Sequence, residues 1–419
     1  MTGESQSHSV PVKVFGRTGA ANAYAIRDFL HRSDVPFEWI ELKTDEQARE
    51  IGVTNANDPR LPICVFSDGT RMECPTIRQI LEKLGWFRDP SPTEYDLAVY
   101  GAGPAGLSAA VYGASEGLRT VVVERWALGG QAGSSPKIEN YLGFPAGISG
   151  AELTERAREQ ACKFGAEILL AREGVRGEFS AGKRTGYLAD GTKLVARTAI
   201  CATGVEYHRL DLPNEEKFRG AGVYYGASEA ALCFNEHVVI VGGGNSAGQA
   251  AMYFAKVARQ VTMVLRGDSL KSTLSSYLLD RIRSAKNIQV LTNTEVTALD
   301  GDLCLRAISL TNRKTGEQIT FQTRWLFICI GGAPHTSWAV EAGVIRDEAG
   351  YLVTGPDLLN DGKAPSGWPL NRHPYYLETN IPGLFAAGDV RHGSVKRCAS
   401  AVGEGAMAVT FAHRYLAEG

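Results

Sequence analysis

The chain has 419 residues, of which 44% are hydrophobic and 21% charged, a balance that excludes a disordered chain or a coiled coil. At about 150 residues per domain, this length allows two to four domains. Forty-four basic and 46 acidic side chains leave a net charge of −2, so we expect no binding to nucleic acid or to an anionic membrane surface. Residues 1–9 are polar and no apolar run approaches the ~18 residues of a membrane span. We therefore expect a cytoplasmic protein with neither a signal peptide nor a membrane span.

The eight cysteines are informative through their spacing. No two of them form a C-x-x-C and none lies in a Cys/His cluster, which excludes a local dithiol, a zinc ribbon and an iron–sulfur site. This pattern is typical of reduced thiols in an intracellular protein, and we expect no metal site. The cysteines are at positions 64, 74, 162, 201, 233, 304, 329 and 398.

Residues 10–88 alternate short apolar runs with helical patterns, which predicts the order strand, helix, strand, hairpin, helix. The predicted strands are 10–15, 37–42, 60–66 and 70–73, and the predicted helices are 20–32 and 76–84. The two strands of the hairpin are joined by a turn at 67–70. Residues 88–93 contain two prolines and are predicted to be a linker.

Two later stretches share one order of elements: a short apolar strand, a glycine-rich turn, a helix and a second strand. In the first stretch these are 97–100, 101–106, a helix to about 116, and 120–123 before Glu124. In the second they are 238–241, 242–247, 248–257, and 260–265 before Arg266. The two turns begin at Gly101 and Gly242, 141 residues apart, so the chain contains an internal repeat.

A glycine-rich turn between a strand and a helix is typical of dinucleotide binding. The first glycine makes the tight turn, the second lets the backbone approach a pyrophosphate, and a small third residue lets helix and strand pack closely. The phosphates then lie against free amides at the positive end of the helix dipole. Glu124, 18 residues after Gly106, predicts a contact with the ribose hydroxyls of an adenosine. Arg266 and Lys271 in the second stretch favour a 2′-phosphate, and hence NADP(H) over NAD(H), although each charge could equally be a solvated strand end.

Together with further motifs, these turns resemble the low-molecular-weight thioredoxin reductases. The motifs are Gly-Gly-Gln at 129–131, Ile-Glu-Asn-Tyr at 138–141, Ala-Thr-Gly at 202–204, the second glycine turn, and the stretch 381–389 that ends in Gly-Asp. The resemblance covers residues 95–419. It implies an α/β fold with two Rossmann-like domains, in which the NAD(P)H domain (216–333) is inserted in the FAD domain (95–215 and 334–419).

The resemblance also implies which residues bind FAD and NADPH. The expected FAD residues are Gly101, Ala102, Gly103, Pro104, Ala105, Glu124, Gly130, Gln131, Asn140, Ala202, Thr203, Gly204, Gly388, Asp389, Lys396, Arg397 and Cys398. The expected NADPH residues are Gly242, Gly244, Asn245, Ser246, Ala247, Arg266, Lys271, Ile330 and Gly331. Within the first set, Gly130, Gln131 and Asn140 are expected on the isoalloxazine side. Asp389 is expected at the ribityl chain or its phosphate, with Gly388 giving the backbone clearance.

The C-terminal helix is expected to begin near Lys396–Cys398 and to direct its amino end at flavin N1/O2, where negative charge collects on reduction. The family usually has an Arg-Gln pair where this chain has Lys396-Arg397. An arginine at the second position favours anionic reduced flavin more strongly, so the usual redox potential of the family is not carried over to this chain.

The redox C-x-x-C of the family lies just before the second glycine turn, and this chain lacks it. Aligning Gly222-Val223 and the strand 238–241 places Gly226-Ala227-Ser228-Glu229 at that site, followed by Ala230 where an acid is usual. No thiolate can attack flavin C4a from this segment, and no dithiol can carry electrons outward. Cys233, a few residues further on, is interpreted as a small buried hydrophobe rather than a displaced thiol.

Residues 1–90 resemble a thioredoxin or glutaredoxin domain without its active-site cysteines. The Thr-Gly-Cys-Pro-x-Cys motif of that family is Thr-Gly-Ala-Ala-Asn-Ala at 18–23, so Ala20 and Ala23 replace both cysteines. Leu61-Pro62 stands where the family keeps a cis-proline. The uses left to such a domain are docking, dimer contacts or shielding a face.

Two cysteines remain in the N-terminal region, but we do not expect them to form a redox pair. Cys64 lies in the middle of a predicted strand. Cys74 is expected to face Ile63, not Cys64, across the hairpin.

The leading hypothesis is an NADPH-oxidising FAD enzyme that passes hydride to the flavin and then electrons to an external acceptor. That acceptor could be an external disulfide, a quinone-like small molecule or a protein carrier docked on the N-terminal domain. The alternative is a flavin-based redox sensor or docking module with little turnover. A third possibility is FAD-only chemistry, with the second dinucleotide site unused. The family resemblance leads us to expect a homodimer.

Overall fold

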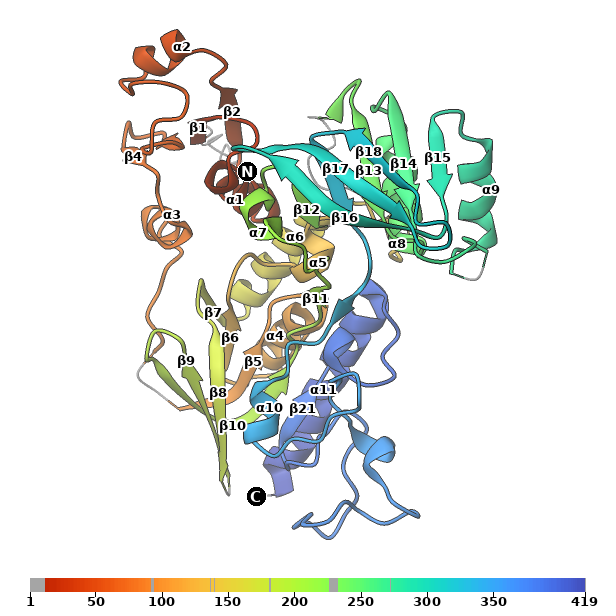
Figure 1. Ribbon diagram of the computed structural model, residues 1–419. Coiled ribbons are helices and arrows are strands. Elements are labelled where there is room, and N and C mark those ends of the chain that lie inside the picture. The colour runs from red at the N-terminus through yellow and green to blue at the C-terminus, as the bar shows by residue number, and fades with distance from the viewer. Residues whose placement is uncertain are drawn as a thin grey trace. The chain divides into compact units, whose positions relative to one another are not determined.

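The structure, a computed structural model, describes residues 12–91, 94–135, 137–138, 140–180, 182–225, 233–271 and 273–418. Its contacts divide the chain into two units. Unit 1 comprises residues 1–31, 35–76 and 207–331, and unit 2 comprises residues 32–34, 77–206 and 332–419. The segment 207–331 is thus inserted in the sequence of unit 2 and shares unit 1 with the N-terminal residues. Figure 1 labels the elements.

The N-terminal part of unit 1 is a four-stranded mixed sheet in the order β2-β1-β3-β4. Its strands are β1 (Val12–Gly16), β2 (Phe37–Glu41), β3 (Ile63–Val65) and β4 (Arg71–Glu73). β1 and β2 run parallel and are connected by α1 (Ala21–Arg32), whereas β3 and β4 form an antiparallel hairpin beside β1. The predicted strand at 60–66 is shorter than expected, because Pro62 has no backbone N–H to donate. The predicted strand at 10–15 begins outside the described residues.

A short helix, α2 (Asp45–Glu50), follows β2 and is absent from the sequence-based prediction. The Thr44 hydroxyl accepts a hydrogen bond from the Gln47 amide at 3.3 Å, and the Gln47 side chain accepts one from the Thr44 amide at 3.3 Å. This reciprocal pair is a capping box, so the Thr-x-x-Gln pattern in the sequence carried the missing signal.

The hairpin register corrects one expectation. Cys74 does not face Ile63, because Ile63 pairs with Glu73. The amide of Phe66 donates to the carbonyl of Thr70 at 2.9 Å, so the loop has three residues instead of the four assumed. Every pair is therefore shifted by one residue, and Cys74 lies beyond the last pair of the ladder.

The rest of unit 1 is built on a five-stranded parallel sheet in the order β12-β19-β13-β14-β15. These strands are β12 (Val223–Tyr225), β13 (His237–Val241), β14 (Gln260–Val264), β15 (Ile288–Leu291) and β19 (Trp325–Ile328). The other elements of this part are α7 (Glu215–Phe218), α8 (Asn245–Phe254), α9 (Ser276–Ser284), β16 (Thr294–Gly301), β17 (Leu305–Asn312) and β18 (Gln318–Gln322). The second predicted strand–turn–helix–strand stretch is present here, with α8 beginning three residues earlier than expected.

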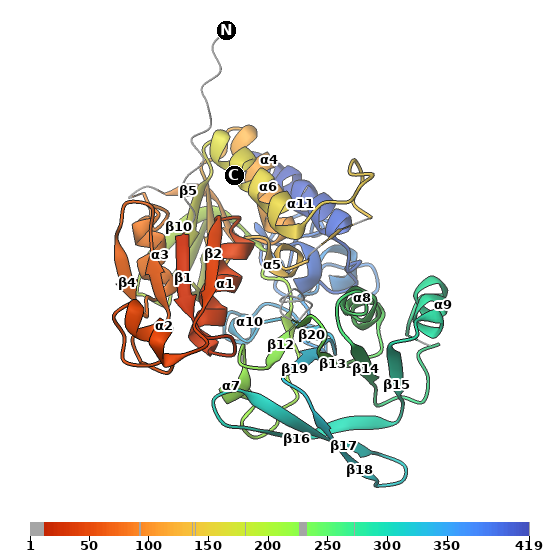
Figure 2. The same cartoon turned by 90° about the horizontal axis from the view of Figure 1, so that it is seen from above.

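The alternation of β13 explains the two cores on either side of this sheet. Val238 and Ile240 pack with the residues of α8 and α9, whereas Val239 and Val241 pack with the antiparallel sheet β16-β17-β18. Figure 2 shows α8 and the antiparallel sheet on opposite sides of the row from β12 to β15.

Unit 2 is built on a sheet in the order β7-β6-β5-β10-β9-β8, with β21 also paired to β10. Its strands are β5 (Tyr95–Tyr100), β6 (Thr120–Glu124), β7 (Glu167–Leu170), β8 (Gly174–Ser180), β9 (Lys183–Leu188), β10 (Lys193–Cys201) and β21 (Leu384–Ala386). Three helices pack together beside it: α4 (Pro104–Ser115), α6 (Gly150–Lys163) and α11 (Cys398–Glu418) (Figure 2). The first predicted stretch is β5, its turn, α4 and β6.

The remaining elements of unit 2 are short. They are α3 (Ile77–Lys83), α5 (Gly130–Gly133), α10 (Trp338–Glu341), η2 (Gly355–Leu358) and η3 (Gly388–Val390). Where the chain passes between the units it forms β11 (Glu206–Tyr207) and β20 (Gly332–Ala333), which pair with each other. No helix among the described residues is both long and apolar enough to cross a membrane.

Helices α4 and α11 approach each other closely enough for their backbones to touch. A Cβ atom at Gly405 of α11 would lie 2.1 Å from the carbonyl oxygen of Ala105 of α4. The Ser108 hydroxyl donates to the Val402 carbonyl at 2.7 Å and ties the same two helices together. The atom in the way of a side chain at position 405 is the backbone carbonyl oxygen of Ala105, which cannot rotate away as a side chain could.

We expect Gly405→Ala to destabilise the protein by about 1–3 kcal/mol, since α4 and α11 must separate to admit the methyl group. Gly403→Ala in the same helix is the matched control, because no atom lies within 4 Å of its Cβ position. That control should be neutral or up to ~1 kcal/mol more stable through helix propensity. Urea unfolding measures both, and equal stability changes for the two variants would contradict this packing argument.

Candidate dinucleotide-binding sites

The first glycine turn, between β5 and α4, is shaped by close backbone contacts. Gly101 has a φ of +102°, and a Cβ there would lie 2.4 Å from the carbonyl oxygen of Ala202. A Cβ at Gly106 would lie 1.8 Å from the carbonyl oxygen of Gly101. Only glycine fits both positions, and the contact brings the motif Ala202-Thr203-Gly204 against the turn.

The second glycine of this turn meets another motif from further along the chain. Gly130 has a φ of +53°, and a Cβ there would lie 3.1 Å from the Cα of Gly103. The atom nearest to a Cβ at Gly103 would be the Cα of Gly130, at 3.8 Å. Gly103 is the N-cap of α4, with Pro104 and Ala105 next and no side chain bonded to the cap. The turn thus presents side-chain-free backbone at a helix N-terminus, which fits the pyrophosphate of a dinucleotide.

Glu124 lies at the carboxyl end of β6 and is fixed by the backbone. Its carboxylate accepts hydrogen bonds from the amides of Ala102 at 2.8 Å and Trp126 at 2.9 Å. The side chain is 9% exposed, and each oxygen keeps a lone pair for a ribose hydroxyl. Glu124 therefore lies beside the first turn, and its contact with an adenosine ribose stays a prediction.

The loop from Gly129 to Gln131 is held from both sides. A Cβ at Gly129 would lie 2.2 Å from the hydroxyl oxygen of Thr154, and its amide donates to the carbonyl of Ala102 at 2.8 Å. The Gln131 side-chain amide donates to the carbonyl of Val205 at 2.7 Å. The loop and the residues that follow Thr203-Gly204 therefore form one bonded group.

A buried ion pair that the sequence did not reveal supports Gly388. Gly388 has a φ of +77°, and a Cβ there would lie 2.9 Å from the Cβ of Ala105. Its amide donates to Glu404 of α11 at 2.7 Å, and the same carboxylate accepts from Arg391 at 2.6 Å. Arg391 is 5% exposed, so Glu404 supplies the counter-charge for a buried guanidinium.

The cation beside Asp389 is Lys396. Its ammonium donates to the backbone carbonyl of Asp389 at 2.6 Å and lies 4.2 Å from the ring centroid of Tyr351. Burial raises the pKa of Asp389 and lowers that of Lys396, while the attraction between the two charges opposes both shifts. Arg397 is exposed and donates to the carbonyl of Lys396 at 2.8 Å. Cys398 begins α11, and burial raises the pKa of its thiol to about 11, so the thiol is neutral at pH 7.

For other residues predicted near the flavin, the structure gives no contact that defines a role, or does not describe them. Asn140 is exposed, and its contact with the flavin stays a prediction. The segment Gly226–Glu229 and Ala230, where the family has its C-x-x-C, lie outside the described residues. Cys233 is completely buried in the core of α8 and β13, as the sequence interpretation expected.

The second glycine turn, between β13 and α8, repeats the geometry of the first. Gly242 has a φ of +138°, and a Cβ there would lie 2.2 Å from the carbonyl oxygen of Cys329. Gly244 caps α8 without a side-chain bond, and no atom lies within 4 Å of its Cβ position. The first three residues of α8 are Asn245, Ser246 and Ala247. This turn therefore also fits a dinucleotide phosphate.

The charged residues predicted for the 2′-phosphate follow β14. Arg266 and Lys271 are both exposed, and neither forms an ion pair with a described residue. Ile330 packs against the core on the β16–β18 side, and the carbonyl of Gly331 accepts a hydrogen bond from the His208 amide at 2.9 Å. No cluster of three or more histidine, cysteine or acidic residues that could hold a metal occurs among the described residues.

Comparison with known proteins agrees with this geometry. Residues 95–405 match the pyridine nucleotide-disulphide oxidoreductase family. The thioredoxin reductases of Treponema pallidum and Bacillus subtilis are each 34% identical to this chain, over 77% of it and 98% and 95% of their own lengths. The chain belongs to this family, as a thioredoxin reductase-like member.

Solved structures give the same result for the fold. Thioredoxin reductase from Lactococcus lactis has a TM-score of 0.68 at 30% identity, and that from T. acidophilum has 0.66 at 29%. Each match covers 78% of this chain and 100% and 99% of the other. Thioredoxin reductases are NADPH-dependent flavoprotein oxidoreductases that bind FAD and NADPH, and this oxidoreductase has the same α/β fold with Rossmann-type sheets.

Replacing Glu404 with glutamine should weaken the flavin site, because Arg391 loses its counter-charge while an acceptor for the Gly388 amide remains. We expect about 3 kcal/mol of lost stability, and looser FAD binding. The control is Glu152→Gln, which breaks an exposed pair with Arg156 and should cost less than ~0.5 kcal/mol. Thermal unfolding measures the loss of stability, and FAD titration measures the weaker binding. A Glu404 variant as stable as the control would refute a stabilising role for the Glu404–Arg391 ion pair.

Replacing Arg266 with alanine should raise the KM for NADPH by about tenfold, through the lost phosphate contact. The KM for NADH should stay unchanged, because NADH has no 2′-phosphate. Arg259→Ala removes another exposed arginine of unit 1 and should alter neither value. Steady-state kinetics give the KM of each variant for NADPH and for NADH. An equal rise in the two KM values would exclude a 2′-phosphate contact.

Proposed function

We propose that the chain oxidises NADPH through FAD and delivers the electrons to an external acceptor without an internal redox disulfide. FAD, when bound, takes a hydride from NADPH and passes electrons on. The proposal is carried by one contrast: both dinucleotide turns are intact, yet the sequence contains no C-x-x-C. Such a protein keeps the electron input of the family and lacks its usual dithiol output.

The chemistry of the buried cysteines supports this proposal. Thiolates, not thiols, are the reactive form. Burial raises the pKa of Cys64 to about 12, and burial also raises the pKa of Cys201. Cys233 and Cys329 are buried as well. None of these four thiols is suited to carry electrons from a flavin to the surface.

In the proposed enzyme, the chain supplies orientation and electrostatics. The bare backbone of Gly103 and Gly130 and the free end of α4 hold the pyrophosphate, and Glu124 holds the ribose. Lys396, beside Asp389, brings a positive charge to the start of α11, where negative charge develops on the reduced cofactor. Residues 95–215 and 334–419 form the FAD domain of this proposal, and residues 216–333 the NADPH domain.

We infer further that the N-terminal residues are a thioredoxin-like domain without the two active-site thiols. The order β2-β1-β3-β4 supports this, as do the parallel β1–β2 pair joined by α1 and the antiparallel hairpin that follows. The Leu61–Pro62 peptide bond is cis, at the place where the resemblance expects it. The proposed protein is a homodimer, and its acceptor is a small molecule or another protein.

Anaerobic stopped-flow mixing with NADPH tests the electron input. The flavin absorbance should bleach within seconds, whereas a sensor with little turnover would show no bleaching over minutes. The Arg266→Ala variant serves as a control, because it should slow bleaching at low NADPH but not at saturation.

Steady-state NADPH oxidation tests the electron output. Rates with oxidised thioredoxin and a dithiol-sensitive dye should stay at background, while a quinone-like or other direct acceptor should sustain turnover. Robust reduction of thioredoxin would show that a redox thiol is present and would refute the proposal.

A further inference from the structure

The N-terminal part of unit 1 packs on the segment 207–331 through one aromatic residue of α1. Tyr24 meets the ring of Tyr224 edge-on, with ring centroids 5.2 Å apart. Tyr224 in turn stacks on Trp325 and Phe327 of β19, at 5.5 Å and 5.2 Å. A Cβ at Gly220 would lie 2.4 Å from the Tyr24 ring. Tyr24 is thus an extension of the core between the parallel sheet and α8.

The loop before α1 is equally close to this segment. A Cβ at Gly19 would lie 3.0 Å from the Cβ of Cys304, in the turn before β17. The space left between Thr18-Gly19 and the side chains of Tyr224 and Trp325 is about 10 Å³, at or below the volume that one water molecule needs. The residues around this space are therefore closely packed.

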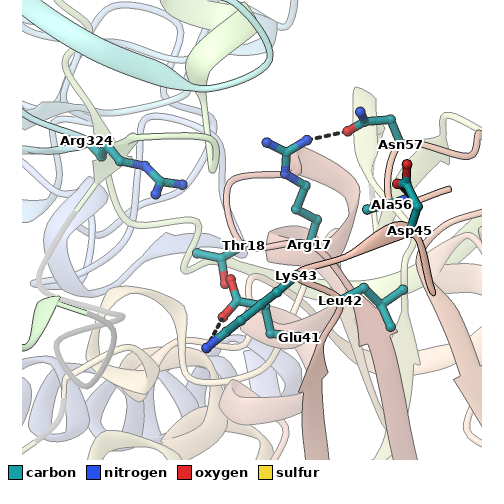
Figure 3. A pocket seen from close by; sticks show the side chains of 9 residues that line it. All are labelled: Arg17, Thr18, Glu41, Leu42, Lys43, Asp45, Ala56, Asn57 and Arg324. Carbon is teal, nitrogen blue, oxygen red and sulfur yellow. Dashed lines mark hydrogen bonds and ion pairs between the residues drawn. The ribbon is translucent and has the colours of Figure 1, made fainter. Parts of the chain in front are cut away.

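Charge does not hold this junction together. At its rim lies an open pocket of about 520 Å³, into which Arg17 of the loop and Arg324 of the 207–331 segment point toward each other (Figure 3). Arg17 bonds to the neutral side chain of Asn57, and neither guanidinium pairs with a described carboxylate. Two facing cations repel, so the apolar contacts of Tyr24 must provide the attraction.

The contact lies at the end of the N-terminal sheet that corresponds to the active site of thioredoxins. It uses residues 18–24, the stretch in which Ala20 and Ala23 stand at the places of the two active-site cysteines of thioredoxins. It meets β12, the edge strand of the parallel sheet, through the ring of Tyr224. The contact therefore uses the end of the N-terminal sheet at which thioredoxins carry their thiols.

We propose that the N-terminal domain is an internal partner of this oxidoreductase, docked on the 207–331 segment by the end at which thioredoxins carry their thiols. The surface formed by Gly220, Tyr224, Cys304 and Trp325 accepts a thioredoxin-like domain, and the chain's own domain occupies it. An external domain of the same fold is excluded from this surface, so electrons leave by another route. The inference rests on the thioredoxin-like assignment proposed above.

A disulfide trap tests the contact in the full-length, FAD-loaded protein. In Gly19→Cys, the new thiol faces Cys304, and diamide should oxidise the two thiols to an intramolecular disulfide in most molecules, as read by peptide mass spectrometry. Gly69→Cys is the matched control, with a similar φ of +81° and no atom within 4 Å of its Cβ. It should form no link, and neither should Gly19→Cys combined with Cys304→Ser.

Failure of Gly19→Cys to link above the Gly69 control, in a variant that binds FAD normally, would overturn the proposal. The trap needs neither NADPH nor an acceptor, so its failure leaves the proposed flavin chemistry untouched.

Hydrogen exchange gives a second test that does not depend on a residue at position 19. In Tyr24→Ala, the amides of Val223–Tyr225 should exchange about tenfold faster, because the aromatic contact that covers β12 is lost. Tyr277→Ala removes a 63% exposed tyrosine of the same unit and should leave these amides unchanged. Unchanged exchange in Tyr24→Ala would also overturn the proposal.

Discussion

The glycine turn between β5 and α4 depends on the absence of side chains around the first turn of α4. Three glycines from distant parts of the chain, Gly130, Gly388 and Gly405, all meet Gly103 or Ala105 at distances that leave no room for a methyl group or require the turn to move. Each contact fixes a different segment: the loop after β6, the turn after β21, and the C-terminal helix. These obstacles are largely backbone atoms, so close packing that leaves no room for side chains positions the segments as much as hydrogen bonds do.

Cysteine is absent from both places at which the family resemblances expect redox thiols, Ala20 and Ala23 and the segment 226–229. The cysteines that remain buried, such as Cys201, Cys233 and Cys329, behave as small apolar residues.

Much of this arrangement could be predicted from the sequence. The two glycine turns and Glu124 followed from local patterns, because a strand, a turn and a helix each leave a signal within about ten residues. The start of the last helix near Cys398 came from the family resemblance. The hairpin register was wrong by one residue, since it depends on whether the loop has three or four members. The clamp between Glu404 and Arg391 and the junction at Tyr24 were missed, because long-range packing leaves no periodic trace.

The grouping of residues 35–76 with residues 207–331 has a consequence for synthesis on the ribosome. About 130 residues separate the end of the first stretch from the start of the second. At ~5–20 residues per second, the N-terminal sheet waits on the order of ten seconds for its partner surface. During that interval it relies on a small core of its own, around Leu42, Val53 and Ile63. Its edge strands, β2 and β4, are short, and this limits their pairing with neighbouring nascent chains.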